Sequence, residues 1–174
     1  MRGNSLGANV GRFVLLFFLQ VFVFRQVSLG WSGKEYLFIW LYPLFIAALP
    51  LRTPRPGVVA LAFLAGLSVD IAYGTLGLHA SAATATGYFR QFPLKFLEPK
   101  DGYKTKSTPE GRDLGQAWWV RYLAYVTVFY CVFYFSVEAF SPVFWQDILL
   151  KCLLSIPVSY LLSLILVSFL RPRL

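Results

Sequence analysis

Two ionisable side chains, Asp70 and His79, lie within an otherwise apolar and glycine-rich stretch of the chain. A charged group inside a membrane span is costly, so the folded protein must compensate Asp70. Gly66 and Ala62 precede Asp70 at intervals of four residues, which puts small residues on one helix face and lets a second helix approach closely. We expect Gly66 and Gly77 to keep two backbones near each other. Two interpretations of the stretch from Gly66 to His79 remain open. In the first it is a tightly packed structural element, in which Asp70 caps a helix end or meets His79 across a short turn. In the second it is a site that recognises a partner or ligand.

Further ionisable side chains lie towards one end of the apolar stretches, namely Arg25, Glu138 and Lys151. Asp147 and Lys151 have the i, i+4 spacing that allows an ion pair on one helix. Snorkelling of long side chains to the membrane surface accounts for these residues without a function. Alternatively they form, with the two residues above, a polar cluster that a partner helix or a small ligand can reach.

Catalytic chemistry is not expected from the residue inventory. Enzymes of the membrane usually carry paired carboxylates, histidine clusters or a nucleophile with its base. This chain has one histidine and eight acidic residues, and four of the acids fall in one hydrophilic stretch: Glu98, Asp101, Glu110 and Asp113. It contains no glycine-rich phosphate loop, HExxH or GxSxG pattern. Cys131 and Cys152 lie in apolar stretches as small hydrophobes, so we expect neither a metal site nor a cofactor.

The composition indicates a membrane protein. Hydrophobic residues make up 57% of the 174 residues and charged residues 14%, whereas soluble domains have about 25% charged residues. The mean hydropathy is +0.61. The chain cannot cover a globule with polar surface, which excludes the disordered and the ordinary soluble classes.

The elements that must position these residues are membrane spans, each of which needs about 20 mostly apolar residues. The sequence predicts one integral membrane domain over residues 1–174, an all-α compact bundle of about six transmembrane helices. The expected spans are residues 13–29, 36–51, 57–73, 76–89, 117–140 and 148–170, with a cytoplasmic loop at 98–116. The count falls to four or five if the proline-containing second span and the semi-polar fourth lie buried or re-entrant. Residues 90–97 are amphipathic and are expected to lie along the inner interface.

The basic residues predict the orientation. With both termini in the cytoplasm, 13 of the 16 lysines and arginines lie on the inner side. The positive-inside rule therefore places the N- and C-termini in the cytoplasm. The net charge of +8 then reports topology and attraction to anionic lipid headgroups, not nucleic-acid binding.

The same central stretch resembles the signature of MreD, the bacterial membrane protein family that determines rod shape. The matching residues are Gly66-Leu67, Asp70 and Leu76-Gly77-Leu78-His79. Further likeness to the Bacteroidetes-type branch lies in Leu19-Gln20, Leu49-Pro50 and the loop Pro99-Lys100-Asp101-Gly102-Tyr103. Length, basic loops and span count agree over essentially the whole chain.

This resemblance implies a non-catalytic component of the cell-wall elongation machinery (the elongasome) in the bacterial inner membrane. MreD-like proteins regulate cell shape and peptidoglycan synthesis by binding MreC and, through it, MreB, RodA and its penicillin-binding transpeptidase. The implied fold resembles the substrate-binding subunits of energy-coupling-factor vitamin transporters. A small-molecule-binding subunit of such a transporter is therefore the alternative function.

Overall fold

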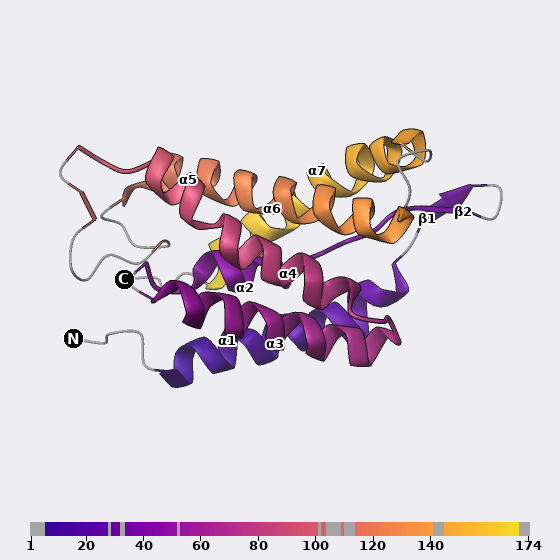
Figure 1. The fold of residues 1–174 in the computed structure, drawn as a ribbon, viewed down its shortest axis with the longest axis horizontal. Coiled ribbons are helices and arrows are strands. Elements are labelled where there is room, and N and C mark those ends of the chain that lie inside the picture. Colours follow the sequence, from indigo (N-terminus) through magenta and orange to yellow (C-terminus); the bar gives the residue numbers. More distant parts are fainter. Residues whose placement is uncertain are drawn as a thin grey trace.

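The protein is described from a computed structural model that covers residues 6–27, 29–31, 34–51, 53–100, 102–103, 109, 114–140 and 145–170. It is mostly helical (Figure 1). Helix α1 (Leu6–Phe18) continues into a π-helical stretch (Leu19–Val23) and a 3₁₀ turn (Phe24–Gln26). A hairpin of β1 (Leu29–Trp31) and β2 (Lys34–Leu37) follows. The remaining helices are α2 (Pro43–Ala48), α3 (Arg55–Tyr73), α4 (Leu78–Phe89), α5 (Gln91–Phe96), α6 (Gln116–Ala139) and α7 (Trp145–Leu170).

Three helices of the described ranges, α3, α6 and α7, are long and apolar enough to cross a membrane. Their outward faces carry large apolar side chains, such as Ile71 of α3 and Leu153 of α7, which are 77% and 71% exposed. Apolar surface of this extent is unfavourable in water and suits contact with lipid. The predicted membrane character is thereby supported by surface as well as by composition.

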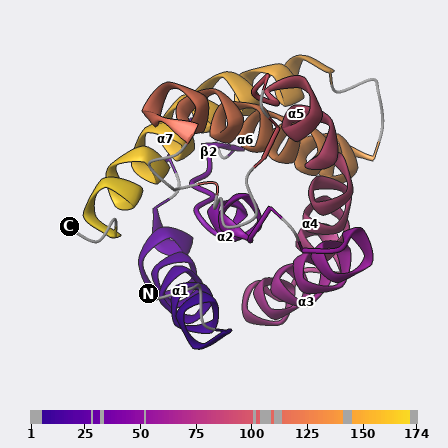
Figure 2. The same cartoon turned by 90° about the vertical axis from the view of Figure 1, so that its left-hand side faces the viewer.

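Helix α2 lies at the centre of the molecule, ringed by α1, α3, α4, α6 and α7 (Figure 2). All six α2 residues are buried, although the helix is too short to cross a bilayer. The β1–β2 hairpin projects at one end of the bundle and α5 lies at the other (Figure 1). We call these the hairpin end and the α5 end.

The second expected span, residues 36–51, is helical only over Pro43–Ala48. The hairpin supplies its first residues, and residues 38–42 run as an irregular segment into the core, where Ile39 to Tyr42 are at most 6% exposed. The prediction of a helix here was wrong because a short apolar run is equally typical of a buried non-helical segment. Pro43 then begins α2, a position where its missing N–H costs nothing. The alternative in which this segment lies buried agrees with the structure.

The other spans differ mainly at their boundaries. The first remains helical to Gln26, and the fifth and sixth correspond to α6 and α7. The fourth is the 12-residue α4, followed directly by α5 in the stretch expected to be amphipathic. Most of the predicted loop 98–116 lies outside the described residues.

Candidate functional site

Asp70 caps the start of α4. Its Oδ1 accepts hydrogen bonds from the backbone N–H of His79 at 3.0 Å and from the Thr75 hydroxyl at 2.5 Å. Its Oδ2 accepts the backbone N–H of Ala80 at 2.7 Å. The carboxylate is 2% exposed, so these donors replace water and compensate a charge that is costly in the core. The expectation that Asp70 caps a helix end is confirmed, and it meets the backbone of His79 rather than the ring.

Two glycines shape the turn between α3 and α4. Gly74 ends α3 at φ +72° and Gly77 precedes α4 at φ +83°, a left-handed conformation that L side chains rarely adopt. A Cβ on Gly77 would meet nothing within 4 Å. The prediction that Gly77 keeps two backbones close was therefore wrong: this glycine is needed for its backbone conformation.

Helices α3 and α4 approach each other closely at Gly66. A Cβ built there would lie 2.5 Å from the carbonyl oxygen of His79 and 2.6 Å from the Cα of Ala80. Both neighbours are backbone atoms, which cannot move aside as a side chain can. The close approach predicted for Gly66 is confirmed. Further along the same two helices, a Cβ built on Gly87 would lie 3.0 Å from the Cβ of Ala62.

The His79 side chain lies buried where α4, α6 and the residue before α2 meet. Its Nδ1 lies 2.9 Å from the Tyr130 hydroxyl and 3.3 Å from the Tyr42 hydroxyl, and the two hydroxyls also hydrogen-bond each other. Nε2 has no hydrogen-bond partner among the described residues. Three further aromatic rings surround the imidazole at centroid distances of 4.7 to 5.2 Å: Trp40, Tyr73 and Tyr134.

This arrangement joins elements, and none of the described hydrogen bonds ties the His79 ring to a carboxylate. A catalytic histidine usually has its ring oriented by a carboxylate, whereas the Asp70 oxygens are occupied by Thr75 and two backbone amides. His79 instead links α4 to Tyr42 and to Tyr130 of α6. The motif between Gly66 and His79 thus forms one rigid junction.

The segment before α2 is held from both sides by polar side chains. On one side Gln20, in the π-helical stretch, donates from Nε2 to the Ile39 carbonyl at 2.9 Å and accepts the Leu41 N–H at 2.8 Å. On the other side the hydroxyls of Ser155 and Ser159 on α7 accept the N–H groups of Phe38 and Trp40, each at 3.0 Å. Non-helical backbone at this depth is tolerated because protein groups satisfy it.

The remaining predicted residues do not join the Asp70–His79 junction as one cluster. Arg25 donates to the Ala72 carbonyl at 2.7 Å and lies over the Tyr73 ring. Lys151 pairs with Glu138 across α6 and α7 at 2.8 Å, rather than in the i, i+4 pair expected on α7. Among the described residues, no hydrogen bond or ion pair links that pair to Asp70 or His79.

A cavity of about 250 Å³ opens at the hairpin end. Its lining is mainly aromatic, with a few polar side chains: Phe24, Arg25, Glu35, Trp40, Tyr73 and Tyr134. The indole Nε1 of Trp40 has no hydrogen-bond partner among the described residues. A cavity with these groups can hold a small molecule that carries a hydrogen-bond acceptor.

Sequence reasoning missed the groups that fasten the core. Ser155 and Ser159 are spaced by four residues within an apolar helix, and Ser163 continues the series; all three are buried. That periodic polar stripe was the available signal. No sequence signal distinguished Tyr42 and Tyr130 from the other tyrosines, because tyrosines are frequent in this chain. Arg90 was counted only as a basic residue of the inner side, yet it is 2% exposed.

The described residues contain no group of three or more histidine, cysteine or acidic side chains that could hold a metal ion. Cys131 and Cys152 are free and buried. Comparison with known families, with curated proteins and with solved structures gave no match. Fold and site therefore define a mostly helical protein with three helices able to cross a membrane and a rigid polar junction in its core.

Proposed function

We propose that the chain is a non-catalytic membrane component of the bacterial elongasome, similar to MreD, that binds MreC and helps to determine rod shape. The Asp70–His79 junction is the observation that carries this proposal. Every residue of the resembling motif named above that is polar or glycine has a distinct structural task there, from the close contact at Gly66 to the cap at Asp70. A buried junction that fixes α3, α4 and α6 relative to one another suits an assembly component more than an enzyme.

The orientation and span count belong to the same proposal. We propose six passes of the chain through the membrane, the second made by the irregular segment 38–42 and the short α2 rather than by a complete helix, with both termini in the cytoplasm. The α5 end then faces the cytoplasm and the hairpin end the other side. Single cysteines introduced at Lys34 and Lys104 test this. A membrane-impermeant thiol reagent applied to intact cells should label position 34 and spare position 104. Labelling at position 104 would reverse the orientation.

The hairpin-end cavity favours a second candidate, a small-molecule-binding subunit of an energy-coupling-factor-type transporter. Its aromatic residues and the Trp40 Nε1, which has no hydrogen-bond partner among the described residues, are the specific support. Its volume of about 250 Å³ is below the range of about 300–1,000 Å³ that is usual for ligand pockets. This candidate therefore stands second.

Co-purification in mild detergent from the native bacterium separates the two candidates. Recovery of MreC-like and RodA-like proteins supports the elongasome. Recovery of a pair of ATPases with a coupling subunit supports the transporter. Recovery of neither set from membranes that contain the protein at native abundance would count against both.

Variants test whether the junction matters for assembly. In a rod-shaped host depleted of its own MreD, Asp70→Ala and Gly77→Leu should remain in the membrane, recover less MreC and give rounded cells. Ser168→Ala is the matched control because that hydroxyl is exposed and bonds only its own helix. Rod-shaped cells and undiminished MreC recovery with Asp70→Ala would show that the junction has only a packing role.

A further inference from the structure

A second and larger cavity, of about 590 Å³, opens at the α5 end. The ends of α3 and α4, together with α5, line it, and three cations border it: Arg55, Arg90 and Lys95. Glu98 is the one acidic side chain among the described residues of the lining. The cavity has the size of a ligand site, and its cations outnumber its acid by two.

Arg90 is a buried cation whose described partners are all uncharged. Its Nε donates to the Tyr122 hydroxyl at 2.7 Å, and its Nη2 donates to the carbonyl oxygens of Leu49 and Pro50. None of the described hydrogen bonds uses Nη1. A buried charge without a counter-ion is unfavourable, so this guanidinium is poised to bind an anion that enters the cavity.

Arg55 and Lys95 stand at the exposed rim of the same cavity. Arg55 begins α3 and Lys95 lies in the last turn of α5. Neither side chain takes part in an ion pair or hydrogen bond with any described residue. These two rim cations and the buried Arg90 make a site for an anion with several oxygen atoms, because arginine and lysine both donate to phosphate.

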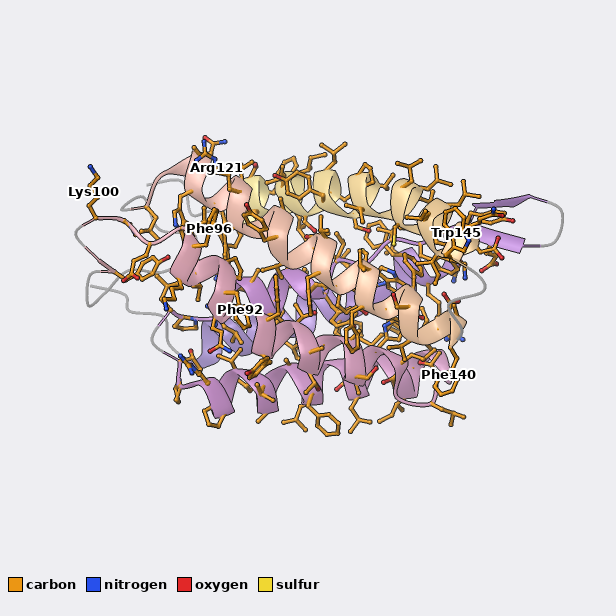
Figure 3. All side chains as sticks on the ribbon, turned by 45° about the horizontal axis from the view of Figure 1, so that its top comes forward. Phe92, Phe96, Lys100, Arg121, Phe140 and Trp145 are labelled. Atoms are coloured by element: carbon orange, nitrogen blue, oxygen red, sulfur yellow. The ribbon has the colours of Figure 1, made fainter. Side chains whose placement is uncertain are left out.

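The surroundings of the cavity are apolar and face outward. Tyr88 and Phe92 belong to its lining and are 60% and 55% exposed. Phe96 is 76% exposed and lies near Phe92 on the outside of α5, at the same end as Lys100 and Arg121 (Figure 3). An anion bound here would have exposed aromatic side chains beside it, along which hydrocarbon chains can pack.

We propose that this cavity binds the phosphate group of an anionic phospholipid, with Arg90 at its inner wall and Arg55 and Lys95 at its rim. Basic pockets between membrane helices are known to hold such headgroups. The proposal concerns the cavity alone and does not depend on the elongasome. In the proposed orientation, the cavity lies at the cytoplasmic leaflet. Inorganic phosphate shares the same chemistry, and the experiment separates the two sources.

The full-length protein, purified in a non-ionic detergent, is titrated with three probes: phosphatidylglycerol, phosphatidylcholine with the same acyl chains, and inorganic phosphate. Retained lipid is counted by native mass spectrometry, and the melting temperature reports binding independently. The test variant Arg55→Gln/Lys95→Gln removes the rim cations without touching a described contact. Lys100→Gln/Arg121→Gln is the matched control, because it removes two exposed charges at the same end that do not line the cavity.

Phosphatidylglycerol should bind more tightly than phosphatidylcholine, and the rim variant should weaken this binding about tenfold or more while the control leaves it unchanged. Stabilisation by inorganic phosphate as strong as by the lipid, and equally lost in the rim variant, supports the phosphate site and assigns it to the free anion. Equal retention of both lipids by the unmodified protein, or equal losses in the rim and control variants, would overturn the proposal.

Discussion

At the hairpin end Asp70, Arg25 and Lys151 each bond to another part of the chain, whereas at the α5 end Arg55 and Lys95 border an open cavity. Charges that are satisfied internally fix the relative positions of helices. Charges left at a cavity remain available to a ligand. The comparison assigns a structural role to the charges at the hairpin end and anion-binding capacity to the cavity at the α5 end, and the following substitutions test it.

The largest effect is expected at Gly66. Replacing it with alanine places a Cβ 2.5 Å from the His79 carbonyl oxygen, so α3 and α4 must separate. Overpacking typically lowers the free energy of unfolding by about 1–3 kcal/mol, and we expect a larger loss here. Gly11→Ala is the control, because nothing lies within 4 Å of its added Cβ and alanine favours a helix. The melting temperature in detergent measures the stability of both variants. Equal melting temperatures for the two variants would show that the junction is not rigid.

The next effect compares one carboxylate from each end. Asp70→Ala removes the acceptor of two buried N–H groups and one hydroxyl, and should lower the free energy of unfolding by about 2–4 kcal/mol. Asp70→Asn should cost less because it keeps one acceptor oxygen. Glu98→Gln at the α5 end should leave stability nearly unchanged and strengthen binding of phosphatidylglycerol, since it removes an anion from the lining. A larger loss from Glu98→Gln than from Asp70→Ala would reverse the comparison.

A smaller effect is expected along α7. Ser159→Ala leaves the buried N–H of Trp40 without its acceptor, which should cost about 1–3 kcal/mol. Ser168→Ala on the same helix should have almost none, because its hydroxyl is exposed and bonds Leu164. Denaturant or thermal unfolding of the two variants in the same detergent gives the difference. Indistinguishable stabilities would mean that α7 does not fasten the segment before α2.

The smallest effect concerns Tyr103 at the α5 end. Its hydroxyl donates to the Leu94 carbonyl at 2.5 Å, and burial raises its pKa from 10 to about 12. The raised pKa means that the neutral phenol stabilises the fold below pH 10, and that this contribution disappears as the pH rises to about 12. The Tyr103→Phe variant has no phenol to ionise, so it should lose less stability than the unmodified protein between pH 10 and about pH 12. Parallel alkaline melting curves of the two proteins over this interval would contradict the assignment.

The sequence was informative where the structure is local. Asp70 and the amides it caps are nine and ten residues apart, so the spacing alone indicated a helix–turn–helix unit. The i, i+4 spacing of Asp147 and Lys151 allowed a pair on one helix, but Lys151 pairs with Glu138, which α6 brings close although it is 13 residues away. The role of Gly77 could not be separated from that of Gly66, because glycine serves both close approach and positive φ.

The segment before α2 marks the limit of pattern reasoning. Hydropathy describes residues 36–51 correctly as buried but does not distinguish helical from extended backbone. What selects the extended form is a set of acceptors on other elements, Gln20 and the serines of α7. Whether the segment is helical or extended therefore depends on tertiary contacts, and in the sequence only the regularly spaced serines indicate those contacts.

That same segment has a consequence for biosynthesis. The N–H groups of Phe38 and Trp40 find their acceptors 117 and 119 residues later in the chain. At about 5–20 residues per second, synthesis needs about 6–24 s to reach those serines. Until then the segment before α2 must stay hydrated or protected by the translocation machinery, because hydrocarbon offers its backbone N–H groups no hydrogen-bond acceptor. Helix α7, made long after the segment itself, is thus the one that allows this segment to take its place in the membrane.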